Sequence, residues 1–156
     1  MSEISVENAH LLAGAAHNGQ LGRDKEPYIS HPEAVAQLLQ GDLSKITGYL
    51  HDVVEDTDVS FEDLRKIGVP EQVIEALRLL SHPPKLTESE YLISIKAIAD
   101  SGNQLAIDVK YADLSHNTDL SRIPKPRKRD FDRKEKYLKA KDILRPFISE
   151  YLQSLG

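Results

Sequence analysis

The stretch Leu50-His51-Asp52-Val53-Val54-Glu55-Asp56 places four ionisable side chains within six residues of an otherwise amphipathic segment. If the stretch is helical, a rotation of about 100° per residue puts all four on one face, within an arc of roughly 140°. Three carboxylates on one face repel one another unless a cation or a proton lies among them. The pattern therefore indicates a metal site more than ordinary packing.

The composition limits the kind of protein and the kind of metal site. A chain of 156 residues is long enough to bury a substantial core, and we expect residues 1–156 to form a single domain. The N-terminus lacks the pattern of a secretory signal, and no run approaches the ~20 apolar residues that cross a bilayer, so we expect a cytoplasmic protein with no membrane partner. Without cysteine, a metal must be held by His, Asp and Glu, which favours Mn, Mg, Fe or sometimes Zn.

The charge distribution bears on the partners. A net charge of −5 argues against nucleic-acid binding. Half of the basic residues, ten of twenty, lie between Arg122 and Lys141, with acidic residues interleaved among them. This segment has three interpretations: a solvated face, which we favour, an attractor for an anionic substrate, or a nucleic-acid contact.

Hydrophobic periodicity predicts an all-α fold, since no stretch shows sustained alternation of apolar and polar residues. Capping signals and proline positions set the expected helix ends. The predicted helices span residues 6–16, 33–40, 44–55, 60–68, 70–80, 87–100 and 105–120, and a long final helix begins near 130, with a break near Pro146.

Three separated places offer metal ligands, and helices can bring them together. They are His31 at a predicted helix start, the pair His51 and Asp52, and Asp113. Two imidazoles and two carboxylates leave up to two open positions on an octahedral divalent ion, for water and substrate. An open position indicates catalysis, because such an ion activates water and neutralises charge on a phosphoryl oxygen.

The motifs that carry these ligands resemble those of a known family. They are Tyr28-Ile29-Ser30-His31-Pro32, His51-Asp52-Val53-Val54-Glu55-Asp56, Val109-Lys110-Tyr111-Ala112-Asp113 and His116-Asn117. In this order they resemble the HD-superfamily hydrolase domain of stringent-response alarmone enzymes. The resemblance implies a compact HD-domain helical bundle with the metal site between helices. Because it covers the hydrolase domain alone, the chain resembles a small alarmone hydrolase without a synthetase domain.

The resemblance also implies roles for individual residues. Mn²⁺ would be held by His31, His51, Asp52 and Asp113. Glu55 and Asp56 would orient or deprotonate the attacking water, and the 3′-pyrophosphate of guanosine tetra- or pentaphosphate would be released. We expect the nucleotide to be contacted by Arg23, Lys25, Ser30, Lys110 and Asn117.

Two other functions stay open at the level of sequence. The family motif His-x-Gly-Gln-x-Arg here has Gly22 in place of its arginine, with Arg23 one residue later. A phosphohydrolase acting on another nucleotide, such as a nucleoside monophosphate or a phosphorylated dinucleotide, is therefore the second hypothesis. A regulatory module that binds a nucleotide without turnover is the third, and the water-activating pair Glu55 and Asp56 argues against it. The sequence does not specify the oligomeric state.

Overall fold

The described residues, 3–155, form helices and connecting loops with no strand among them, as a computed structural model shows. The prediction of an all-α fold is confirmed. The α-helices are α1 (Val6–Ala16), α2 (Ser30–Leu38), α3 (Asp42–Leu50), α4 (Val53–Asp56), α5 (Phe61–Lys66), α6 (Glu71–Leu80), α7 (Glu88–Asp100), α8 (Gln104–Asn117) and α9 (Lys128–Leu144). There are also three 3₁₀ helices among these residues. They are η1 (Leu120–Arg122), between α8 and α9, and η2 (Arg145–Phe147) and η3 (Glu150–Leu155), after α9.

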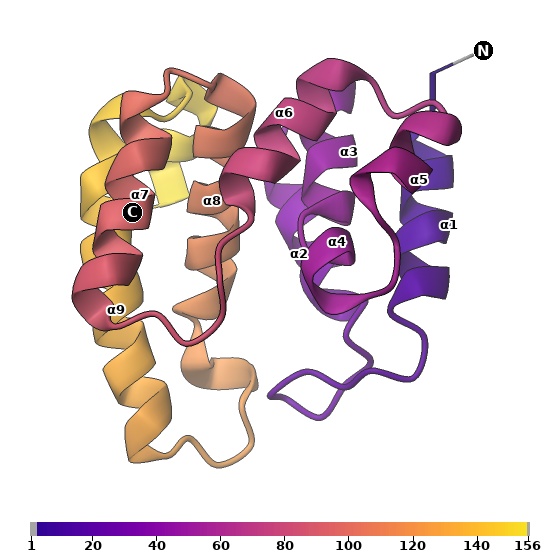
Figure 1. Cartoon of the computed structure of the whole chain (residues 1–156). Helices are drawn as coiled ribbons and strands as arrows, with labels where there is room; N and C mark the ends of the chain where they lie inside the picture. Colours follow the sequence, from indigo (N-terminus) through magenta and orange to yellow (C-terminus); the bar gives the residue numbers. More distant parts are fainter. Residues whose placement is uncertain (1–2, 156) are drawn as a thin grey trace.

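Helix α8 connects the two halves of the molecule. Figure 1 shows α1 to α6 in one half, and α7, α9 and the C-terminal turns in the other. Helix α8 packs against α2, α3 and α6 on one side and against α7 and α9 on the other. Nine of its residues are buried, and three of these, Asp108, Lys110 and Asp113, are charged. Burying charge is costly unless it is paired, so α8 must meet partners for these groups.

The hydrophobic core consists of two clusters. One lies among α1, α3, α5 and α6 and includes Leu50, Leu64 and Ile74. The other gathers side chains of α2, α7, α8 and α9 with the C-terminal turns, and includes Tyr111 and Leu144. The packing of α8 against both sets of helices holds the two clusters side by side, so the polar groups of α8 lie at their junction.

Several helix ends follow the sequence signals. Helix α7 begins after Thr87, whose hydroxyl accepts a hydrogen bond from the Glu90 amide while the Glu90 carboxylate accepts one from the Thr87 amide. This capping box satisfies two amides that the helix itself leaves unpaired. At the other end of the chain, α9 passes into the 3₁₀ helix that contains Pro146, where a break was predicted.

The predicted helix over residues 44–55 is wrong at its most informative point. Helix α3 ends at Leu50, His51 and Asp52 form a turn, and the short α4 begins at Val53. One local and one long-range side-chain hydrogen bond compete with the helical pattern here. The His51 ring Nδ1 lies 2.6 Å from the Gly48 carbonyl oxygen, and the Tyr28 hydroxyl donates to the Asp52 carboxylate. The four ionisable residues therefore do not share one continuous helical face.

A second correction concerns His31. Helix α2 begins at Ser30, three residues before the predicted start at 33, so His31 lies in the first turn of the helix and is buried. Pro32 also lies in this first turn, where its missing amide hydrogen costs nothing. The early start fixes the direction of the His31 side chain by helical geometry.

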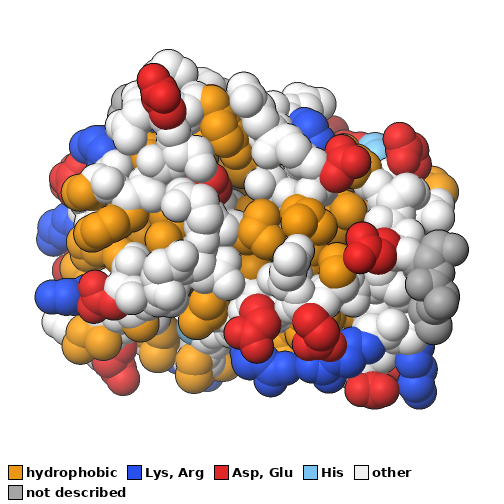
Figure 2. Space-filling view, turned by 90° about the horizontal axis from the view of Figure 1, so that it is seen from above, with side chains coloured by type: hydrophobic (Ala, Val, Ile, Leu, Met, Phe, Trp, Pro, Cys, Tyr) orange, Lys and Arg blue, Asp and Glu red, His pale blue; other side chains and the backbone are white. Residues whose placement is uncertain are grey.

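The surface has a mixed character. Figure 2, a view from above Figure 1, shows hydrophobic side chains over the centre of this face, with most of the charged side chains nearer its edges. Within residues 3–155, no helix combines the length and the apolar character that crossing a bilayer requires.

Substitution of Gly48 in α3 tests how closely this helix packs against α2. A Cβ there would lie 2.9 Å from Cδ1 of the buried Leu39 and 3.4 Å from the Ala36 Cα, whereas a Cβ at Gly14 in α1 meets nothing within 4 Å. Gly48→Ala is expected to lower the free energy of unfolding by about 1–3 kcal/mol, because the site is already filled. The control Gly14→Ala is expected to raise it by about 0.4–1 kcal/mol. Chemical denaturation measures both, and shifts of the same sign would contradict the packing argument.

Candidate metal centre

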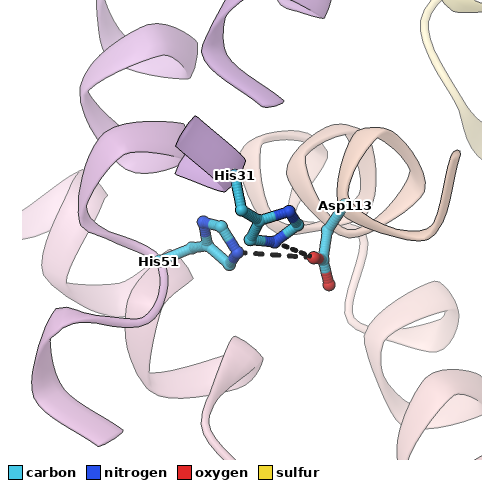
Figure 3. Close-up of side chains that lie close together, drawn as sticks. All are labelled: His31, His51 and Asp113. Carbon is cyan, nitrogen blue, oxygen red and sulfur yellow. Dashed lines mark hydrogen bonds and ion pairs between the residues drawn. The ribbon is translucent and has the colours of Figure 1, made fainter. Parts of the chain in front are cut away.

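Three buried side chains from three helices converge at the junction of the two clusters. His31 comes from α2, His51 follows the last residue of α3, and Asp113 comes from α8. One possible ligand atom of each lies within 4.8 Å of those of the other two. Figure 3 shows both imidazole rings directed at the Asp113 carboxylate. The His31 Nε2 atom is 2.8 Å and the His51 Nε2 atom 3.4 Å from Asp113 Oδ1.

Asp52 adds a second carboxylate beside this group. Its Oδ2 atom lies 3.0 Å from His51 Nε2 and 3.9 Å from His31 Nε2, and the same oxygen accepts a hydrogen bond from the Tyr28 hydroxyl. Burial raises the pKa of Asp52, but the neighbouring His51 more than offsets this, and the net pKa lies below its ordinary value. The carboxylate is therefore ionised at neutral pH.

The state of the His51 ring provides a test of whether a metal ion fits. Its Nδ1 atom faces the Gly48 carbonyl oxygen, which only accepts hydrogen bonds, so Nδ1 carries a proton. Its Nε2 atom is buried without a hydrogen bond of acceptable geometry, although oxygens of Asp52 and Asp113 lie within 3.4 Å. In a neutral ring the Nε2 lone pair would point at two carboxylates. Such an arrangement needs a cation or a proton between the groups, so the donor set fits a divalent ion.

The same carboxylates affect the protonation of His51. Burial lowers its pKa, but the nearby Asp52 and Asp113 outweigh burial and hold the pKa well above the ordinary value. A proton on Nε2 is thus the substitute for a cation when no ion is bound. Because a metal ligand must give up that proton, binding of an ion here releases it.

Asp113 has hydrogen-bond partners on both oxygens. Lys110 donates to Oδ2 at 3.1 Å, and Asn117 donates to Oδ1 at 3.1 Å. Burial opposes ionisation, but the Lys110 ammonium and the two histidines lower the pKa of Asp113 well below its usual range. Lys110 itself is buried, and its pairing with Asp113 raises its pKa. Two residues predicted to contact substrate therefore also hold a predicted metal ligand in place.

We call His31, His51, Asp52 and Asp113 together the candidate metal cluster. It lies beside a cavity of about 480 Å³ that is bordered by His31, Asp52 and Asp113. Most of the segments that close it lie in the lower half of Figure 1: the loop between α1 and α2, the loop between α6 and α7, η1, and the first half of α9. Six basic side chains line the cavity: Arg23, Lys85, Lys110, Arg122, Arg133 and Lys136. A cavity with the buried Asp113 and the partly buried Asp52 at one end, and this many cations along its walls, suits a polyanion.

The other predicted substrate contacts divide into two groups. Arg23, Lys110 and Asn117 line this cavity, and one Arg23 nitrogen is 3.8 Å from the buried Asp130. Lys25 instead lines a neighbouring cavity of about 300 Å³, and Ser30, at the start of α2, lines neither. The structure thus brings three of the five side chains to the metal cluster's cavity.

Glu55 and Asp56 are the two exposed residues of α4, which follows Asp52 directly. The Glu55 carboxylate accepts a hydrogen bond of 2.6 Å from the His82 amide, which ties α4 to the loop after α6. The Asp56 carbonyl oxygen accepts a bond of 3.0 Å from the Gln20 side chain. Partial burial and the nearby carboxylates of Asp52 and Glu55 raise the pKa of Asp56 to about 6.

Sequence reasoning missed several residues of the site. Tyr28 binds Asp52, and His116 Nδ1 lies 2.7 Å from His31 Nδ1. Tyr91 and Lys136 line the cavity from α7 and α9. A signal existed for His116, because a residue three positions after Asp113 lies on nearly the same helical face. None existed for Tyr91 or Lys136, whose positions depend on how α7 and α9 pack.

The all-helical fold, with histidines and aspartates gathered between helices, is the arrangement of an HD-type domain. No family model matches the chain. Among solved structures, the chain resembles one described as a metazoan ortholog of SpoT that hydrolyzes ppGpp, with a TM-score of 0.80 and 24% sequence identity. The match covers 96% of this chain and 90% of that one. This likeness shows the fold.

Curated relatives extend the likeness to sequence. The chain is 37% identical over 130 residues to a putative GTP diphosphokinase RSH1, chloroplastic, of Arabidopsis thaliana. It is 34% identical over 122 residues to a probable guanosine-3′,5′-bis(diphosphate) 3′-pyrophosphohydrolase of Synechocystis, and 31% identical over 125 residues to the bifunctional (p)ppGpp synthase/hydrolase SpoT of Escherichia coli K12. These matches take in 70 to 72% of this chain but only 15 to 17% of the relatives. The chain is therefore an HD-type domain related to the stringent-response proteins of the SpoT and RSH type.

The raised pKa of Asp56 predicts a pH-dependent stability of the metal-free protein. Below about pH 3 the group is protonated in both the folded and the unfolded state. As the pH rises toward about 6, the unfolded state releases its proton first, so folding becomes less favourable, and the penalty is complete above that pH. Asp56→Asn removes the penalty and is expected to raise the Tm at about pH 7.5 in the presence of a chelator, with no difference from wild type at about pH 3.

Thermal melts across this pH range measure the effect, with Asp58→Asn, an exposed aspartate two residues further on, as the control. A Tm difference for Asp56→Asn that persists at about pH 3 would show that the stabilisation has another origin.

Proposed function

We propose that the chain is a metal-dependent phosphohydrolase that removes the 3′-pyrophosphate from guanosine tetra- or pentaphosphate. The observation that carries the proposal is the convergence of His31, His51 and Asp113, with Asp52 beside them, at one end of a cavity lined with cations. The likeness to the Synechocystis relative, a probable guanosine-3′,5′-bis(diphosphate) 3′-pyrophosphohydrolase, supports the choice of substrate.

In this proposal Mn²⁺ is held by His31, His51, Asp52 and Asp113. Hard carboxylate oxygens together with imidazole nitrogens suit Mn²⁺, and the chain has no thiolate that would favour a softer ion. When bound, such an ion activates water and neutralises charge on the phosphoryl oxygens. Lys110 and Asn117 keep the Asp113 carboxylate in its orientation, and Tyr28 does the same for Asp52.

Proton transfer in the proposed reaction falls to Asp56. A general base works best when its pKa lies near the working pH, and the raised pKa of Asp56, about 6, meets that condition better than an ordinary aspartate does. Glu55 fixes the position of α4 through its bond to the His82 amide, and so keeps Asp56 beside the cluster. Both residues thus serve the attacking water, one directly and one by placement.

Charge along the cavity suits a nucleotide with two diphosphate groups. Of the six cations, Lys110 pairs with Asp113, Arg122 with Asp24, and Arg23 with Asp130 at the longer distance of 3.8 Å. The other three, Lys85, Arg133 and Lys136, have no ion pair within the described part of the chain. These three supply positive charge that an anionic ligand can neutralise.

Lys136 is the best placed of these unpaired cations. Its ammonium lies 4.7 Å from the centre of the Tyr91 ring and 5.2 Å from that of Tyr137, so two aromatic faces restrict it. Burial and the neighbouring Arg133 lower its pKa, and the opposing effect of Glu88 does not offset them. We assign Lys136 to the phosphate groups that lie away from the metal end of the substrate.

The residues of this proposed site lie between Arg23 and Tyr137, and most of them line one cavity, whereas His51, Glu55 and Asp56 are not among its lining residues. We therefore propose that the chain acts as a single hydrolase domain.

The function is tested by incubating purified protein with Mn²⁺ and guanosine tetraphosphate and identifying the products, with a nucleoside monophosphate and a phosphorylated dinucleotide as competing substrates. Guanosine diphosphate and pyrophosphate are expected. His51→Ala is expected to abolish both Mn²⁺ binding and turnover. Asp56→Asn is expected to keep Mn²⁺ binding and to lower kcat by about 10²–10⁴-fold, the usual contribution of a general base.

The control for these variants is Asp58→Asn, which is expected to leave both properties unchanged. Equal rates in chelator and in Mn²⁺ would refute the proposed mechanism, and release of a different leaving group would refute the substrate.

The role of Lys136 predicts a distinct kinetic effect. Lys136→Ala is expected to raise the KM for guanosine tetraphosphate about tenfold, the equivalent of about 1.4 kcal/mol of binding, with little change in kcat. Lys139→Ala serves as the matched control, because Lys139 lies one turn away and pairs with Glu88 outside the cavity. Steady-state kinetics in constant salt separate the two constants, and an unchanged KM would remove Lys136 from the binding site.

A further inference from the structure

Two histidine rings meet behind the proposed metal site. The Nδ1 atom of His116, in the last turn of α8, lies 2.7 Å from the Nδ1 atom of His31. The ring centres are 4.9 Å apart, and the ring planes meet at 29°. His116 is not part of the converging ligand group, which consists of His31, His51 and Asp113. It therefore touches a proposed ligand without being one.

A bond between two Nδ1 atoms requires one proton between them, and the site determines which ring holds it. The Nε2 atom of His31 faces Asp113 Oδ1 and the proposed ion position. When Nε2 acts as a metal ligand it carries no proton, so a neutral His31 has its proton on Nδ1. His31 then donates, and His116 Nδ1 must be the acceptor. The ring orientation of a metal-binding histidine is commonly fixed by such a bond from its other nitrogen.

His116 is free to hold its own proton elsewhere. His31 lines the cavity of the metal cluster, whereas His116 lines a different cavity of about 420 Å³, bounded by α8, α9 and the C-terminal turn. The pair of rings therefore spans the wall between two cavities. With its Nδ1 atom accepting from His31, a neutral His116 carries its proton on Nε2.

We propose that His116 is a positioning residue for the metal centre: its Nδ1 atom accepts the Nδ1 proton of His31 and so holds the His31 ring with the Nε2 lone pair directed at the ion. The inference rests on the metal role given to His31 in the proposed function. No other ring nitrogen in residues 3–155 lies within hydrogen-bonding distance of His31 Nδ1.

The test uses Mn²⁺ alone, without substrate, and compares two variants. His116→Leu keeps a side chain of moderate size but removes the acceptor. It is expected to weaken Mn²⁺ binding by about 10–100-fold, as loss of such a partner commonly does. His116→Asn places an amide oxygen close to the position of Nδ1 and is expected to bind within about threefold of wild type.

Calorimetric titration with Mn²⁺ gives the dissociation constants. His10→Leu is the matched control, since His10 also stacks on an aromatic ring, that of Tyr49, but lies outside the metal cluster. Wild-type affinity in His116→Leu would overturn the proposal. Equal weakening in both His116 variants would also overturn it, because it would show that shape matters and not the acceptor.

A second measurement determines directly which ring nitrogen of His31 carries the proton. In the protein loaded with diamagnetic Zn²⁺, nitrogen–proton correlation spectra of the histidine rings are expected to show His31 with a protonated Nδ1 atom. A protonated Nε2 in the loaded protein would contradict the proposal even if the affinities followed the expected order.

These outcomes are separable from those of the hydrolase assay. If wild-type protein binds no Mn²⁺, the metal role and this inference fail together. If Mn²⁺ binds with the expected order of affinities but guanosine tetraphosphate is not cleaved, only the substrate assignment fails.

Discussion

The structure depends on keeping one carboxylate charged inside the protein. Asp113 lies on α8, the helix that packs against both halves of the molecule, and the residue is only 6% exposed. An isolated buried carboxylate would cost several kcal/mol. Lys110 and Asn117 from the same helix and His31 from α2 offset that cost with hydrogen bonds. The helices can pack only in an arrangement that brings these partners together, so the fold and the site form by the same contacts.

Local signals explain what could be predicted from the sequence. The bounds of α1 were predicted at Val6 and Ala16, and the Thr87 capping box placed α7, because these features depend on residues a few positions apart. The convergence of His31, His51 and Asp113 was also expected from their motifs. Of the residues expected to contact the nucleotide, Arg23, Lys110 and Asn117 line the cavity beside the candidate ligands, whereas Lys25 and Ser30 lie outside it.

Long-range packing explains what could not be predicted. The break between α3 and α4 depends partly on the hydrogen bond between Tyr28 and Asp52, two residues on different elements. The contact between His31 and His116 joins positions 85 residues apart. The helical spacing places His116 near the face of Asp113, but it does not encode His31 as the partner. Each of these cases involves a side chain that contacts a proposed metal ligand, so the supporting residues are harder to predict from sequence than the proposed ligands.

The donors and the cavity walls belong to different kinds of structure. His31, His51 and Asp113 are anchored on α2, α3 and α8 at the centre of the packing, whereas Arg23, Lys85 and Lys136 come from two loops and an outer helix. Changes in those outer segments alter the shape and charge that a ligand meets but leave the donor geometry intact. Under the proposed function, evolution can therefore change which phosphorylated molecule is accepted while keeping the same donor geometry, and the loop of residues 81–87 is the simplest place for such divergence.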